Sequence, residues 1–244
     1  MAEQTKKAWY KKWWVWVIAV LVLAGIGGAM SGGGTAETQG AEQSSQKQEQ
    51  SSQQTESPTP VASIVYDAEL GSGNYTSGID FPAGTYDIEV VSGNGNVSSD
   101  NQFDGGINAI MGVKDDDLYQ KSYSNISLPE DTLLRISGGV VVKIHSEDAS
   151  GAALSKREQP NTEEIELSNG NFVAGTDFPA GVYDIQAVSG NGNVSSDNIY
   201  SGGLNAIMGV KNDELYEKEY KNISLEEGVT LKIDGVKIKL VPSK

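Results

Sequence analysis

The residues with the clearest potential for chemistry lie in a run of eleven that occurs twice without a change, at 91–101 and again at 188–198. Its sequence is Val-Ser-Gly-Asn-Gly-Asn-Val-Ser-Ser-Asp-Asn. Amides, hydroxyls and carboxylates of this kind can hydrogen-bond to a sugar or a peptide, and binding residues are concentrated in loops. The candidate ligand-binding residues are therefore Asn94, Asn96, Ser98 and Asp100, with their counterparts Asn191, Asn193, Ser195 and Asp197.

The same run also has a structural interpretation, which is the one we favour. Asn-Gly pairs supply the positive φ that tight turns require, and Asn, Ser and Asp side chains cap nearby backbone. A calcium loop is disfavoured, because the glycine at the sixth position and the acid at the twelfth position of such loops are missing. The pair Gly93-x-Gly95 does not open a helix, so it does not predict a phosphate site. We therefore predict no metal and no cofactor.

Two further groups of residues have chemical potential and a plainer alternative. Tyr119 and Tyr123, matched by Tyr216 and Tyr220, could form a platform for a sugar ring, although tyrosines so placed more often cover the edge of a core. His145 is the only histidine of the chain and has no counterpart near Val241. Because no nucleophile and base can be paired, the sequence predicts a protein that is not an enzyme.

The charge of the chain is acidic and unevenly distributed. Lys and Arg number 18 against 33 Asp and Glu, yet residues 1–12 hold four lysines and a single acid. Phosphate backbones are repelled by so acidic a remainder, so we predict no nucleic-acid partner. The absence of cysteine excludes disulfides, thiolate metal sites and a cysteine nucleophile.

The N-terminal segments predict a membrane anchor. Residues 13–30 carry no charge, and eighteen helical residues span about 27 Å, close to the thickness of a bilayer core. Tryptophans and lysines crowd the N-terminal side, which predicts a cytoplasmic tail at 1–12 and an extracellular location for the bulk of the chain. The alternative is a cleaved signal peptide, with Gly27 and Ala29 before the cut. Residues 31–61, rich in Gly, Ser, Gln and Glu, predict a disordered linker.

The strongest feature of the sequence is an internal duplication. Residues 70–136 align with 167–233 at a constant offset of 97, and 44 of the 67 positions are identical. We therefore predict two homologous units, at 62–145 and 161–242, separated by a linker at 146–160.

Each unit is predicted to be β-rich. Residues 86–90 and 183–187 alternate apolar and polar side chains, and the turn sequence Asp-Phe-Pro-Ala-Gly precedes each of them, at 80–84 and 177–181. Further short strands and turns follow, and no soluble helix is apparent. The predicted fold class is an all-β ectodomain of two small sandwich-like repeats, with a jelly roll or a barrel as alternatives.

The pattern D-F-P-A-G-x-Y-D-I, followed by S-G-N-G-N and G-G-x-N-A-I-M-G, resembles repeated units of uncharacterised surface or secreted proteins of Gram-positive bacteria. The resemblance covers both units and implies a bacterial surface location, without an established activity.

These features lead us to expect a membrane-anchored surface protein whose duplicated domains bind a cell-wall glycan or a protein partner. Duplication favours binding, because two linked sites raise avidity. The alternatives are a structural spacer with no specific ligand and, less favoured, an envelope hydrolase.

Overall fold

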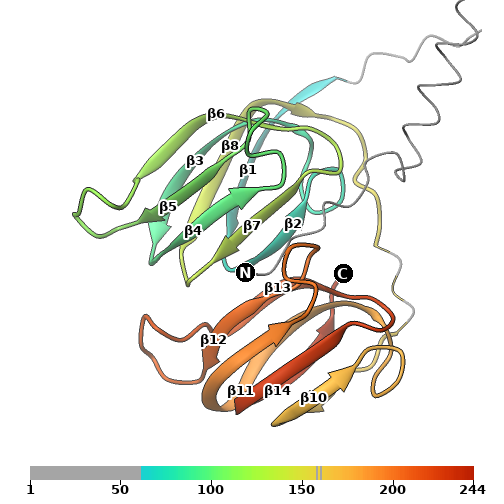
Figure 1. The fold of residues 1–244 in the computed structure, drawn as a ribbon. Helices are drawn as coiled ribbons and strands as arrows, with labels where there is room; N and C mark the ends of the chain where they lie inside the picture. Colours follow the sequence, from blue (N-terminus) through green and yellow to red (C-terminus); the bar gives the residue numbers. More distant parts are fainter. Residues whose placement is uncertain (1–61, 158, 160) are drawn as a thin grey trace, which may run out of the picture. The chain divides into compact units, whose positions relative to one another are not determined.

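A computed structural model describes residues 62–244 with the exception of 158 and 160. The described residues form strands and turns without a helix, which confirms the predicted all-β class (Figure 1). The strands of the first repeat are β1 (Ser63–Leu70), β2 (Gly73–Thr76), β3 (Gly84–Ser92), β4 (Asn94–Ser99), β5 (Asn108–Gly112), β6 (Ser122–Leu128), β7 (Leu133–Ser137) and β8 (Val141–Ser150). Those of the second are β9 (Ile165–Leu167), β10 (Gly170–Val173), β11 (Gly181–Ser196), β12 (Asn205–Gly209), β13 (Glu219–Leu225) and β14 (Thr230–Pro242).

The first repeat consists of two sheets that share one hydrophobic core. One sheet has the order β1-β8-β3-β6 and the other contains β2-β7-β4-β5, each with antiparallel pairing. Alternation along β3 buries Tyr86 and Ile88 and exposes Asp87 and Glu89. The core draws on both sheets, since Ile88 of one and residues of β4, β5 and β7 in the other belong to the same cluster. The sheets do not close into a barrel, so the barrel alternative is wrong for the described residues.

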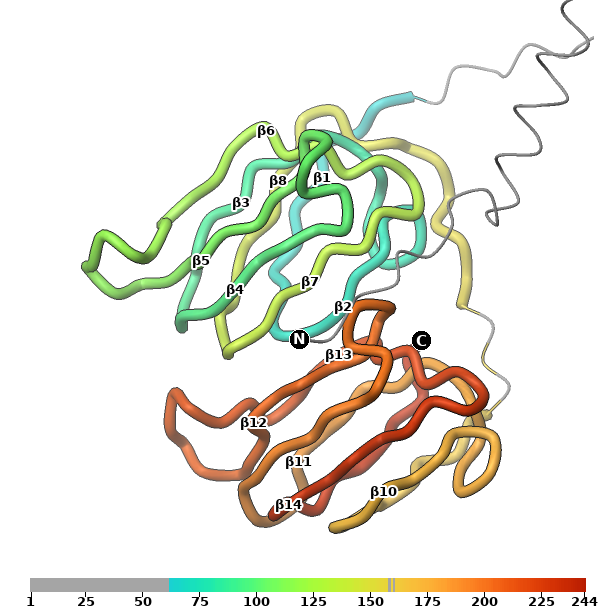
Figure 2. Tube along the Cα trace, in the orientation of Figure 1, coloured from blue at the N-terminus to red at the C-terminus, as the bar shows by residue number. Residues whose placement is uncertain are grey.

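The second repeat has the same arrangement with fewer interruptions. The strand β11 takes the place of β3 and β4, and β14 takes the place of β7 and β8 (Figure 2). In the first repeat Gly138 and Gly139 both have positive φ between β7 and β8, whereas the second repeat has Gly235 alone at this corner. One residue fewer at the corner lets the strand continue through the bend.

The Asp-Phe-Pro-Ala-Gly motif closes a turn and anchors the core at the same time. In the first repeat Asp80 Oδ2 accepts a hydrogen bond from the Thr76 N–H at 2.7 Å, and Phe81 is fully buried. The hydroxyl of Tyr86 donates to the Pro82 carbonyl at 2.6 Å. The second repeat repeats these bonds, from the Val173 N–H to Asp177 Oδ2 and from the Tyr183 hydroxyl to the Pro179 carbonyl, each at 2.7 Å. The motif that carries the resemblance is therefore explained by turn geometry and burial.

The boundary at the end of the first repeat lies later than the sequence suggests. Residues 146–150, expected to begin the linker, continue β8 and pair with β1, where Ser150 lies opposite Ser63. Ser146 and Ala149 are buried. A Cβ on Gly84 would lie 2.9 Å from the Ala149 Cα, so β8 packs closely against the start of β3.

The core residues of both repeats lie between positions 66 and 240, inside a compact unit that spans Ser57–Lys244. A fragment with these bounds therefore contains both cores and is suited to experiments. The predicted tail (1–12), transmembrane helix (13–30) and linker (31–61) fall outside the described residues. Within residues 62–244 as described, no helix has the length and hydropathy needed to cross a membrane.

The two repeats share a sheet through one short parallel contact. The edge strand β2 of the first repeat lies beside β13 of the second, with Gly73 opposite Lys221. The Lys221 N–H donates to the Ser72 carbonyl at 3.0 Å. A Cβ on Gly73 would lie 2.9 Å from the Lys221 Cβ, so glycine allows this approach.

Candidate functional site

The unchanged run forms a corner and a strand. Its first half leads from β3 into β4, and its second half is β4 itself, where Val97 and Ser99 are buried and Ser98 is only partly so. Gly93 has a positive φ of 72°. A Cβ on Gly95 would overlap the Ser137 carbonyl, and one on Gly192 would overlap that of Asp234. These close approaches require glycine in both copies.

The side chains of the run are engaged in holding neighbouring segments. Asn94 Oδ1 accepts the Lys114 N–H at 3.2 Å, and Asn191 Oδ1 accepts the Lys211 N–H at the same distance. At the far end of the run, Asp100 Oδ1 accepts the Leu133 N–H at 3.2 Å. The second copy has the same bond from the Thr230 N–H to Asp197 Oδ1 at 3.1 Å. These bonds tie β4 to the segment after β5 and to β7.

The candidate residues therefore do not converge on one point. Asn94 begins β4 and Asp100 follows its end, and Asn96 and Ser98 lie between them on the strand. In the second repeat Asn193 donates to Asn205 Oδ1 at 3.2 Å, and Ser195 is partly buried beside it. Structural bonds and close packing are sufficient to account for the unchanged sequence. The tight turn expected at its Asn-Gly pairs is wrong, because Asn94 and Gly95 begin β4 and the positive φ falls on Gly93.

One of these residues, Asn94, also lines a groove between the two repeats. This open groove has a volume of about 890 Å³. The first repeat contributes the β3–β4 corner, the Gly138-Gly139 corner, Lys114 and Tyr119, and the second contributes residues 212–219. We call it the inter-repeat groove. No sequence pattern predicts this groove, because its walls come from segments far apart in the chain.

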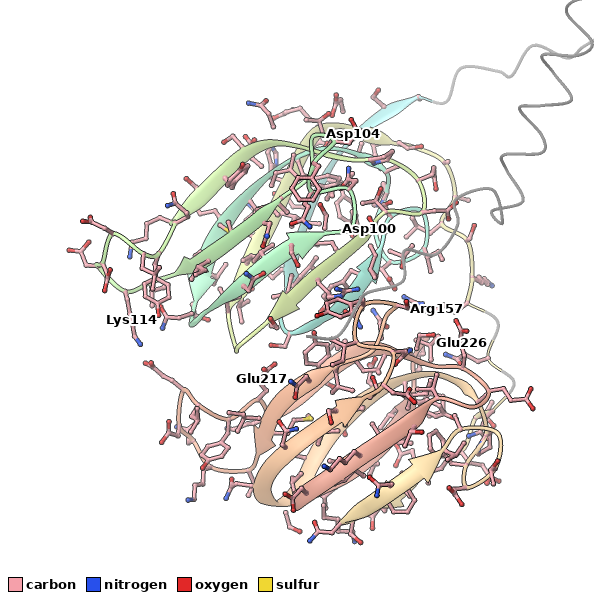
Figure 3. All side chains as sticks on the ribbon, in the orientation of Figure 1. Asp100, Asp104, Lys114, Arg157, Glu217 and Glu226 are labelled. Carbon is pink, nitrogen blue, oxygen red and sulfur yellow. The ribbon has the colours of Figure 1, made fainter. Side chains whose placement is uncertain are left out.

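Lys114 is the positive charge of the first-repeat wall (Figure 3). Its ammonium group lies 5.8 Å from the centre of the Tyr119 ring and 3.7 Å from Glu214 Oε2. Lys211 repeats the first of these contacts over Tyr216 at 5.7 Å, but it does not line the groove. Each lysine therefore lies over a tyrosine ring that lines the groove.

Glu217 is a buried carboxylate in the wall of the groove, with 7% of its surface exposed (Figure 3). Its Oε1 accepts the Gly138 N–H at 3.1 Å, whereas Oε2 has no hydrogen-bond partner among the described residues. Burial raises the pKa of the Glu217 carboxyl, and the hydrogen bonds from Ser72 and Gly138 oppose that rise. Because Oε2 has almost no exposed surface, it is an unsatisfied acceptor inside the wall and not a group that a ligand in the groove reaches directly.

The second group with chemical potential, His145, lies on the outer face of the sheet formed by β1, β8, β3 and β6. Its Nδ1 lies 3.1 Å from Asp67 Oδ1, and its Nε2 lies 3.2 Å from Glu147 Oε1. These bonds raise the pKa of His145. With both ring nitrogens bound to carboxylates, neither is positioned to take a proton from a nucleophile.

The tyrosine pairs separate into different surroundings. Tyr220 is buried in the second core, and Tyr123 is exposed, so the four rings do not form a common platform. Tyr119 and Tyr216 instead line the inter-repeat groove. No group of three or more His, Asp or Glu side chains among the described residues is placed to hold a metal ion.

Comparisons of the chain with protein-family models, with curated proteins and with solved structures found no match. The function is therefore argued from the residues and their geometry.

Proposed function

We propose that the chain is a membrane-tethered surface protein whose two β-sandwich repeats bind an envelope glycan without catalysis, in the inter-repeat groove. The uncharged segment 13–30 and the lysines before it support the tether and its orientation. The composition of the groove is the observation that carries the binding role.

The groove combines the groups that bind carbohydrate. Tyrosine rings pack against the apolar face of a sugar, and amides and carboxylates accept its hydroxyl hydrogens. Tyr119 and Tyr216 supply rings, Asn94 an amide, and Glu214 an exposed carboxylate. Carboxylates outnumber amines along the wall, so the preferred ligand is a neutral or amine-bearing glycan.

Retention of the fragment 57–244 on isolated peptidoglycan tests the proposal. We expect wild-type retention to be insensitive to a calcium chelator and to fall at least tenfold in Tyr119→Ala. The matched control is Tyr123→Ala, which removes an exposed tyrosine that does not line the groove and is expected to bind as the wild type does.

The competing functions give different results. A structural spacer predicts no retention of any variant. A peptide or protein ligand predicts retention on peptidoglycan stripped of glycan but not of its peptides. Release of soluble sugar fragments during the assay would indicate a hydrolase.

A further inference from the structure

Two different faces form the contact between the repeats, one from the first repeat and one from the second. The first face belongs to β2, where Asn74 is 2% exposed and its Nδ2 donates to the carbonyls of Gly202 and Gly203 at 2.8 and 3.1 Å. Beside it, Arg135 donates to the Tyr200 carbonyl at 2.7 Å. The second face therefore consists of the turn before β12 together with the edge of β13.

Two further bonds complete the contact. Asn222 donates from Nδ2 to Asp80 Oδ1 at 3.3 Å, and Lys114 pairs with Glu214. Together with the pairing of Gly73 and Lys221, these bonds define what we call the β2 face and the β13 face. Because the two faces differ, each repeat has one of each.

Duplication leaves one face of each kind unoccupied in the described chain. The strand β10, the counterpart of β2, is at one end of its sheet and pairs only with β14. The strand β6, the counterpart of β13, is at the end of the other sheet and pairs only with β3. Open sheet edges are the usual places at which another chain adds a strand.

The free β10 face retains the donors and acceptors of the β2 face. Asn171 takes the position of Asn74, Lys232 that of Arg135, and Asp177 that of Asp80. Asn171 and Lys232 are exposed, and the side chain of Asn171 makes no hydrogen bond to another described residue. The same chemistry is therefore presented to solvent.

The free β6 face retains the matching groups of the β13 face. Gly105 and Gly106 take the positions of Gly202 and Gly203, and Asn125 takes that of Asn222. Asn125 and Asn222 share a positive φ, 57° and 56°, so their side chains leave the backbone in the same direction. The ion pair between Lys114 and Glu214 also has its counterparts. Asp117 takes the position of Glu214, and Lys211 takes that of Lys114.

We infer that the β10 face of one molecule docks on the β6 face of a second copy, which gives a head-to-tail assembly. The contact is heterologous, so it propagates into a chain unless the rotation between copies closes a ring. This inference does not depend on the glycan-binding proposal, because it uses a different surface.

The contact between molecules is weaker than the one within a molecule. Ser124 replaces Lys221, and Arg157, which is paired with Asp80, comes from the connection between repeats and has no equivalent. Within the chain the Gly138 N–H donates to Glu217 of the other repeat. Its counterpart, the Gly235 N–H, cannot do the same because it is already bound to Asn169 Oδ1. Within the chain the linker supplies an effective concentration of about 1 mM, whereas free molecules lack this advantage. The acidic charge of the chain also opposes association, so added salt favours it.

Sedimentation of the fragment 57–244 up to about 1 mM, in 0.15 M and in about 0.5 M salt, measures the assembly. We expect the average mass to rise with concentration, and to rise further at the higher salt. A single mass of one chain under all conditions overturns the inference.

Two near-isosteric variants block one face each. Asn171→Asp replaces the donating amide of the β10 face with a carboxylate that repels the Gly105 and Gly106 carbonyls. Asn125→Asp sets a carboxylate of the β6 face against that of Asp177. Each variant alone is expected to need at least tenfold more protein for the same association. An equal mixture is expected to form a dimer and stop there, since each variant retains one working face.

The controls separate this arrangement from others. Asn108→Asp adds the same charge on an exposed position of β5 and is expected to associate as the wild type does. If Asn125→Asp lowers the unfolding midpoint, Asn125→Gly removes the amide at a positive φ without adding charge. Wild-type association by either single-face variant overturns the inference, because it would indicate a symmetric contact or another surface.

Discussion

Asn74 and Asn171 occupy the same position in the two repeats, yet Asn74 is buried against the second repeat and Asn171 is exposed to solvent. The amide of Asn74 donates to two carbonyls of the second repeat. One residue type at one position thus serves as an interface group in the first copy and as a surface group in the other.

The first prediction follows from this difference. Asn74→Ala removes both hydrogen bonds to Gly202 and Gly203 and is expected to weaken the contact between repeats by about 2 kcal/mol. Hydrogen exchange of the Lys221 N–H, which donates to Ser72, should become faster. Asn171→Ala is the matched control and is expected to leave the exchange unchanged in dilute protein. Equal exchange rates in the two variants would contradict the arrangement of the repeats.

The second prediction concerns the glycines of the unchanged run. Gly95→Ala and Gly192→Ala place a Cβ against the carbonyls of Ser137 and Asp234, and each is expected to lower the free energy of unfolding by more than about 2 kcal/mol. Gly71→Ala is the control, since no atom lies within 4 Å of its added Cβ. Urea unfolding followed by circular dichroism measures all three, and a tolerated Gly95→Ala would remove the packing explanation for this run.

The third prediction concerns the pH dependence of stability at Glu217. Because burial raises the folded-state pKa of this carboxyl, its contribution is fully present below the unfolded-state pKa and is lost as pH rises through the folded value. Gln120 takes this position in the first repeat, so Glu217→Gln is a natural replacement. We expect the variant to match the wild type near pH 4 and to exceed it at pH 8 by about 1 kcal/mol.

Urea midpoints across this pH range measure the effect at Glu217. Glu219→Gln serves as the control for the loss of a charge at a more exposed site in the same segment. A constant difference between Glu217→Gln and the wild type at all pH values would show that Glu217 does not titrate differently in the folded protein.

The fourth prediction uses the single histidine of the chain. The hydrogen bonds to Asp67 and Glu147 raise the pKa of His145, so its stabilising effect is present below about 6.5 and fades as pH rises past the folded value. Titration of the imidazole by proton nuclear magnetic resonance should give a midpoint above that of a free histidine. In Asp67→Asn the midpoint should fall toward the ordinary value, and an unchanged midpoint would show that the Asp67 contact is absent in solution.

Sequence patterns predicted the features of the fold that are local. The duplication, the alternation of Tyr86 and Ile88 with polar neighbours, and the turn before them all depend on residues close in the chain. The strand β4 escaped prediction because Asn, Gly and Ser have low strand propensity and resemble a loop. Its extended form is imposed by packing on β7, with Gly95 against Ser137 as the closest approach.

Features that join distant segments could not be predicted. The inter-repeat groove brings together the β3–β4 corner and residues 212–219, and no pattern in the sequence indicates that these segments lie close together. The burial of Glu217 depends on Gly138, which belongs to the other repeat. The linker boundary was placed too early because the residues after His145 are polar, although Ser146 and Ala149 are buried.

The pairing of β2 with β13 has a consequence for the order of events during synthesis. Asn74 and the Gly202 carbonyl that it binds are 128 positions apart, whereas the first core is complete at Ala149. At roughly 5 to 20 residues per second, the first repeat can fold seconds before its partner emerges from the ribosome. During that interval the β2 edge has no partner strand, and only its short length of four residues limits pairing with another chain. A neighbouring nascent chain whose own β13 pairs with this edge would form a domain-swapped dimer. The yield of monomer is therefore expected to fall as the density of ribosomes on one messenger RNA rises.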